Sequence, residues 1–165
     1  MDDALAFASA TTLAALVREK KASAVELLEF FLARVEKFNP RVNAIIGLQA
    51  DVARKAAAER DALTAKGQSL GPLHGVPMTV KESFDVAGMP STWGLPAYRD
   101  NIAAQDALAV QRLQRAGAVV FGKTNVPAWL ADWQSFNSIY GTTSNPWNVE
   151  RTPGGPSFHA RNLPF

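Results

Sequence analysis

The sequence has no cysteine and only two histidines, His74 and His159. The absence of cysteine excludes a disulfide framework, a cysteine-ligated zinc site and a cysteine nucleophile. A Ser-His-Asp triad would need one of the two histidines. His74 lies in a glycine-flanked turn, where a hydrogen bond to the backbone is the simpler role, and His159 lies in the last residues of the chain. We therefore do not expect a histidine-based triad.

The sequence also lacks long hydrophobic runs and a strong excess of charge. No apolar run approaches the ~20 residues of a membrane-spanning helix. The chain begins Met1-Asp2-Asp3, which is acidic where a secretory signal is basic. Its 17 Lys and Arg residues are scattered and nearly balance 15 Asp and Glu residues, so nothing resembles a nucleic-acid footprint. We expect a cytoplasmic protein with no nucleic acid, membrane, metal or cofactor partner, and the sequence leaves its oligomeric state open.

The first third of the chain is predicted to be helical. Ser23 and Glu26 match a capping box, in which each side chain satisfies a free backbone N–H at the start of a helix. This helix has its apolar residues at helical spacing, and Asn39-Pro40 is expected to end it. The predicted helices cover residues 11–20, 23–38 and 51–66. They carry no recognisable chemistry, so we expect them to cover a sheet.

Two apolar runs downstream have the length of strands. Residues 76–80 are bounded by glycine and proline on both sides, and residues 118–121 follow a helix expected at 106–116, with Asp106 as its cap. A strand, loop, helix and strand in this order favour parallel neighbouring strands. Because 165 residues can bury one sizeable core, we predict a single domain of the α/β class.

Lys81 lies at the end of the first of these strands. Lysines are almost never fully buried without a partner, and burial disfavours the charged form, so a neutral amine becomes accessible as a base or nucleophile. The simpler interpretation is that the strand emerges at Lys81 and its ammonium reaches water. The residues alone leave both possibilities open.

Gly117 to Thr124 matches the phosphate-loop pattern G-x-x-x-x-G-K-T letter for letter. That loop needs a strand before it and a helix after it. Here a helix is predicted before it, and the four residues between the glycines are apolar and strand-forming. We therefore predict a strand rather than a nucleotide site, with Lys123 as a structural residue or a salt-bridge residue near a pocket.

Several ordered motifs resemble the amidase signature family. The segment at 74–92, HGVPMTVKESFDVAGMPST, is similar to the lysine segment of that family. It is followed by similar motifs, which are GAVVFGKTN at 117–125, YGT at 140–142, NPWN at 145–148 and RTPGG at 151–155. The resemblance implies the N-terminal part of the amidase signature fold, in which helices cover a mixed β-sheet that is incomplete in this chain.

The resemblance also implies a mechanism. These enzymes hydrolyse amide bonds with a serine nucleophile, a second serine on a cis peptide bond, and a lysine that acts as general base, which corresponds to Lys81. Where the family continues Ser-Ser-Gly-Gly, this chain has Pro156 and Ser157, so Ser157 is at most a vestige of the paired serines. We divide the chain into an amidase-like part at 1–155 and an atypical tail at 156–165, which suggests a frameshift or truncation.

Three functions stay open at this point. The first is an amidase-type hydrolase of carbon–nitrogen bonds that acts on a small-molecule amide, with this chain inactive alone because the nucleophile is absent. The second is a glutaminase-type subunit of a tRNA-dependent amidotransferase. The third is a non-catalytic product, which is either a remnant or a fragment that binds a partner through the aromatic region 129–147. The aromatic side chains of that region fit core packing and a lid better than substrate contact. Directly before that region, Ala128 replaces an acidic residue that is common in the family, which weakens any prediction of a local ion pair.

Overall fold

A mixed sheet of three strands lies at the centre of the computed structural model, which describes residues 3–155. The strands are β1 (Ile45–Leu48), β2 (Pro77–Lys81) and β3 (Val119–Thr124), in the order β1–β3–β2. Strand β3 runs parallel to β2 and antiparallel to β1. The predicted α/β class, and the two parallel strands expected at 76–80 and 118–121, are therefore confirmed.

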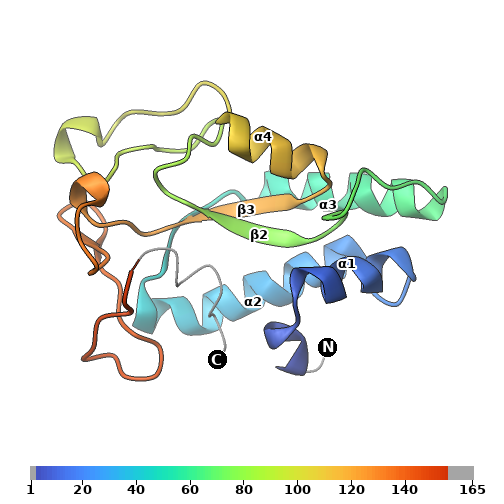
Figure 1. Cartoon of the computed structure of the whole chain (residues 1–165), viewed down its shortest axis with the longest axis horizontal. Coiled ribbons are helices and arrows are strands. Elements are labelled where there is room, and N and C mark those ends of the chain that lie inside the picture. The colour runs from blue at the N-terminus through green and yellow to red at the C-terminus, as the bar shows by residue number, and fades with distance from the viewer. Residues whose placement is uncertain (1–2, 156–165) are drawn as a thin grey trace.

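Four α-helices within the described residues surround this sheet: α1 (Ala10–Arg18), α2 (Ala24–Val42), α3 (Ala50–Ala65) and α4 (Leu108–Arg115). Figure 1 shows the sheet between α4 and the pair α1 and α2. Shorter elements complete this part of the chain: η1 (Asp3–Phe7), η2 (Pro96–Tyr98), η3 (Ala128–Leu130), β4 (Phe136–Asn137) and β5 (Gly141–Thr142). Within residues 3–155 no helix is both long and apolar enough to cross a membrane.

The central strand β3 is buried along its whole length. Val119 and Phe121 pack with α2 and α3 on one face, whereas Val120 packs with Val80 and Val110 on the α4 face. Successive side chains of a strand point to opposite faces, so a strand covered on both sides needs a continuous apolar run. This explains why residues 118–121 do not alternate between polar and apolar.

The prediction that Asn39-Pro40 ends the second helix is wrong, because α2 continues through Pro40 to Val42. Asn43 ends it instead, in the left-handed conformation with φ 51°. The Asn39 side chain supports this ending: Oδ1 accepts from the N–H groups of Ala44 and Ile45, both at 2.9 Å. Proline removes one helical hydrogen bond, and this side-chain network stabilises the last turn in its place.

Two helix starts also differ from the sequence prediction. Helix α1 was predicted over residues 11–20 but begins at Ala10, and it is capped by Ser9, whose Oγ accepts from the backbone N–H of Thr12 at 3.1 Å. Helix α4 has no side-chain cap. Asp106 instead accepts a hydrogen bond from the backbone N–H of Ala87 at 2.8 Å, so it fixes the loop after β2.

The glycines that follow α3 and α4 provide a matched pair for a stability test. Gly67 and Gly117 both have positive φ, at 72° and 101°. A Cβ at Gly67 would meet nothing within 4 Å, whereas one at Gly117 would lie 2.4 Å from Cα of His74. We expect Gly67→Ala to cost about 1 kcal/mol, from backbone strain alone, and Gly117→Ala about 3 kcal/mol, because strands and turn must move apart. Urea unfolding of both variants measures the difference, and equal costs would contradict the predicted clash.

Candidate active site

Lys81 is the last residue of β2, and its side chain is half-buried. Its neighbour Val80 packs on the α4 face, so Lys81 projects from the opposite face of the sheet. Within residues 3–155 the Lys81 side chain makes no hydrogen bond and no ion pair. The predicted strand with a lysine at its end is therefore present, but β2 is only partly buried, since of its five residues Pro77 and Val80 alone are fully buried. The Lys81 amine is left available for another partner.

Glu82, directly after Lys81, is fully buried and was not identified from the sequence. Its carboxylate accepts hydrogen bonds from the backbone N–H groups of Thr92 and Trp93, the latter at 3.0 Å. Its own N–H donates to the carbonyl of Thr124 at 3.0 Å. These bonds join the end of β2 to the end of β3 and to the loop at 91–94, so the backbone on which Lys81 sits is fixed from two sides. The only sequence signal was an acidic residue directly after the strand.

Lys123 contrasts with Lys81, because its side chain is buried and fully engaged. Its Nζ donates to the carbonyl of Pro90 and to Oγ of Ser91, the latter at 2.8 Å. Burial lowers the pKa of Lys123, and the carboxylates of Glu82 and Asp85 act in the opposite direction. Lys123 makes no ion pair within residues 3–155. The strand predicted in place of a phosphate loop is confirmed, and the hydrogen bonds of Lys123 agree with the structural role predicted for it.

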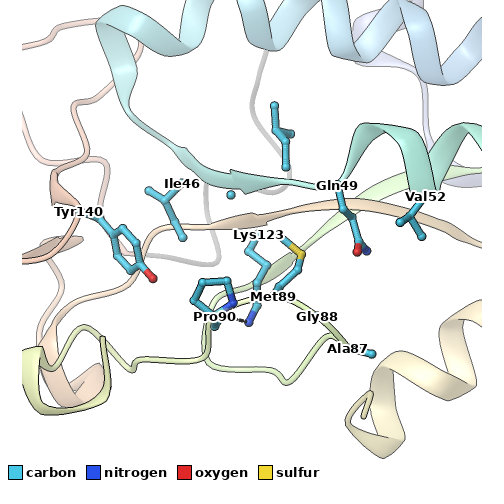
Figure 2. Close-up of a pocket in the computed structure, with 11 residues that line it drawn as sticks. Ile46, Gln49, Val52, Ala87, Gly88, Met89, Pro90, Lys123 and Tyr140 are labelled. Atoms are coloured by element: carbon cyan, nitrogen blue, oxygen red, sulfur yellow. Dashed lines mark hydrogen bonds between the residues drawn. The ribbon is translucent and has the colours of Figure 1, made fainter. Parts of the chain in front are cut away.

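A cavity of about 310 Å³ lies on the Lys123 side of the sheet, between β1 and the loop at 87–90 (Figure 2). Its walls are mostly apolar, and they include Ile46, Val52, Met89, Gln49, Lys123 and Tyr140. The Tyr140 hydroxyl donates to Glu82 at 3.5 Å, and burial raises the pKa of that phenol. Lys81 does not line this cavity, which agrees with the side chains of Lys81 and Lys123 lying on opposite faces of the sheet.

Two buried asparagines hold the segment at 135–144 against the end of β3. Asn125 Nδ2 donates to the Gly141 carbonyl and to Thr143 Oγ1, at 3.1 and 3.0 Å. Asn137 Nδ2 donates to Asn125 Oδ1 at 3.0 Å, and its own Oδ1 accepts from the backbone N–H of Tyr140 at 2.8 Å. Fully satisfied buried amides fix a unique arrangement, so this network positions the segment that leads to residue 155.

The aromatic region does not form a core. Trp129, Trp133, Phe136 and Trp147 are between 53% and 80% exposed. The core-packing interpretation is wrong for these four side chains, whereas a lid or a substrate contact stays a prediction. The sequence could not separate these roles, because exposed and buried aromatics have the same spacing in an irregular segment.

His74 accepts a hydrogen bond at Nδ1 from the backbone N–H of Leu70 at 3.1 Å, and its Nε2 lies 3.0 Å from the Arg60 carbonyl. The predicted backbone hydrogen bond is therefore confirmed. His159 and Ser157 lie outside the described residues. In the part of the chain that the structure describes, no group of three or more His, Asp or Glu side chains could hold a metal ion.

Comparison with known proteins gives a consistent result. The protein-family model described as Amidase matches residues 26–157. An indoleacetamide hydrolase of Bradyrhizobium diazoefficiens is 44% identical over 149 residues, which cover 90% of this chain and 28% of that protein. One of the subunits of the glutamyl-tRNA(Gln) amidotransferase of Acidothermus cellulolyticus is 40% identical over 149 residues, which cover 90% of this chain and 30% of that protein.

Among solved structures, a fatty acid amide hydrolase superposes with a TM-score of 0.88 and 30% sequence identity. The match covers 94% of this chain and 28% of that one. The chain therefore spans less than a third of the length of each of these three relatives, and its sheet and covering helices correspond to part of the fold of the fatty acid amide hydrolase.

Proposed function

This chain belongs to the amidase family, and we propose that in an amidase polypeptide it supplies the general base, Lys81, for hydrolysis of a carbon–nitrogen (amide) bond. The observation that supports this role is the contrast between the two lysines near the ends of β2 and β3. Lys123 is held by Pro90 and Ser91, whereas the half-buried amine of Lys81 has no partner within residues 3–155. A lysine placed on a fixed backbone with an uncommitted amine suits proton transfer.

The chemistry follows the Ser-cisSer-Lys route that the family resemblance implies. A serine hydroxyl is a weak nucleophile until a base accepts its proton, and a neutral lysine amine can do this through the intermediate serine. The serine oxygen bonds to the amide carbon, the carbon–nitrogen bond breaks, and the proton passes to the leaving amine. Water then hydrolyses the acyl-enzyme, and backbone N–H groups stabilise the oxyanion in both steps.

The 165-residue chain contains Lys81 but has Pro156 at the position of the first of the paired serines and only Ser157 at the second. Because lysine without a serine nucleophile cannot form the acyl-enzyme, we propose that the chain alone does not hydrolyse amides.

A hybrid enzyme tests both parts of this proposal. Residues 1–155 are joined to the part of the Bradyrhizobium indoleacetamide hydrolase that follows its matched region, and ammonia release from indole-3-acetamide is measured. We expect turnover by the hybrid and none by the 165-residue chain, with the unaltered hydrolase as positive control. Turnover by the 165-residue chain that is lost in its Lys81→Ala variant would contradict the proposed inactivity. A folded but inactive hybrid would contradict the assignment of an amidase role to residues 1–155.

A glutaminase-type function is the second candidate, because the Acidothermus amidotransferase protein is nearly as similar to this chain as the hydrolase is. A second hybrid, built in the same way with that protein and assayed for ammonia release from glutamine, addresses it. Each hybrid is compared with the unaltered protein from which its second part comes. If the second hybrid keeps a larger fraction of that activity than the first hybrid does, the glutaminase class is favoured.

A further inference from the structure

Thr124, the last residue of β3, carries a buried hydroxyl that nothing in the described chain uses. Its side chain is 1% exposed, and its Oγ1 has no hydrogen-bond partner within residues 3–155. A buried hydroxyl without a partner costs about 1–3 kcal/mol, and such groups are rare enough in folded proteins to need an explanation. A position selected only for packing would be filled equally well by valine.

Thr124 is the residue opposite Lys81 on the neighbouring strand. The two residues are partners in the parallel register of β2 and β3, and neighbouring strands are about 4.8 Å apart. Both side chains lie on the same face, because the residues before them, Val80 and Lys123, are directed to the α4 side of the sheet. The four-carbon stem of lysine is long and flexible enough to bring its amine to such a neighbour.

The backbone of Thr124 is also rigidly held. Its carbonyl accepts from the N–H of Glu82 at 3.0 Å, and the next residue, Asn125, donates from its backbone N–H to Ala44 at 2.9 Å. The Asn125 side chain is held by Gly141 and Thr143 as well. An acceptor on so fixed a backbone is preorganised and loses little conformational freedom when it forms a contact.

We propose that Thr124 is a positioning residue for Lys81: the two side chains are not bonded to each other in this structure, and a rotation of the Lys81 stem brings its amine to Oγ1 of Thr124, which accepts a hydrogen bond and holds the amine at the end of the β2–β3 strand pair. The catalytic meaning of this contact rests on the proposed function, in which Lys81 is the base. The proposed contact involves only residues of this chain, so it can be tested without turnover.

The test uses the 165-residue chain and measures how fast acetic anhydride acetylates Lys81, by mass spectrometry of the digested protein. The exposed Lys55 and Lys66 serve as internal references. Thr124→Val keeps the shape and removes the hydroxyl, so the amine loses an acceptor that favours its protonated, unreactive form. We expect Lys81 to react about fivefold faster in this variant, the factor that corresponds to one net hydrogen bond, and at the wild-type rate in Thr124→Ser.

Ser135→Ala is the matched control, since Ser135 is also buried with an unpartnered hydroxyl but lies outside β2 and β3. It should leave the Lys81 rate unchanged. An unchanged rate in a folded Thr124→Val variant, or an equal increase in Ser135→Ala, would overturn the proposal. If near-UV circular dichroism shows that the valine variant is unfolded, Thr124→Ala replaces it. An inactive hybrid enzyme would argue against the proposed function but would leave the measured acetylation rates of Lys81 unchanged. The failure of the proposed function and the failure of this proposal are therefore distinguishable.

Discussion

Replacing Lys81 with methionine in the hybrid enzyme is expected to lower kcat by about 10⁴-fold. Methionine keeps an unbranched apolar stem of similar length but has no group that accepts a proton. Loss of the base from a serine-type catalytic unit costs this order of magnitude, because the members of the unit act together. Binding of substrate and stabilisation of the oxyanion do not depend on the amine, so KM should change much less. Steady-state kinetics with indole-3-acetamide provide the measurement.

Lys123→Met is the matched control, because Lys123 lies near the end of the neighbouring strand but uses its amine to hold Pro90 and Ser91. We expect this change to lower the melting temperature while the folded fraction keeps kcat within about tenfold of the unaltered hybrid. The assignment of the base would be wrong if the Lys81→Met hybrid kept more than a tenth of the unaltered kcat while the Lys123→Met hybrid kept less than a tenth of it.

Glu82→Ala is expected to destabilise the 165-residue chain by about 4 kcal/mol. The carboxylate is fully buried and accepts from two backbone N–H groups of the loop, those of Thr92 and Trp93. Alanine would leave both donors unsatisfied and would remove a negative charge that favours the buried Lys123 ammonium. Removing one partner from a buried charged network costs several kcal/mol, which is a large part of the total stability of a domain.

Urea unfolding followed by circular dichroism measures this loss. Glu36→Ala supplies the control, because Glu36 is exposed on α2 and such surface changes stay within about 0.5 kcal/mol. A cost below about 1 kcal/mol for Glu82→Ala would show that the loop at 91–94 does not depend on the carboxylate.

The parts of the fold that local physics determines were predictable from the sequence. The apolar runs at 76–80 and 118–121 became parallel strands, and the capping box of Ser23 and Glu26 is present, with both hydrogen bonds formed. The strand ending in Lys81 was recognisable because a charged residue directly follows a mostly apolar run bounded by glycine and proline. Each of these signals lies within a few consecutive residues.

The features that were not predictable depend on partners distant in sequence. Asp106 was predicted as a helix cap, yet it binds the N–H of Ala87. Glu82 gains its importance from a loop ten residues downstream. The unsatisfied hydroxyl of Thr124 became visible only once the register placed it opposite Lys81. Local patterns cannot report such pairings, because several arrangements of the loops are compatible with the same helices and strands.

The strand order β1–β3–β2 also has a consequence for synthesis on the ribosome. Within residues 3–155, β1 and β2 pair only with β3, which is made last. Until residue 124 has left the exit tunnel, both earlier strands have unpaired edges, although α1 to α3 can already form. Nascent chains that wait for a distant strand fold slowly and expose edges that favour association. A translational pause just after β3 should therefore improve the soluble yield, whereas a pause just before it should lower it.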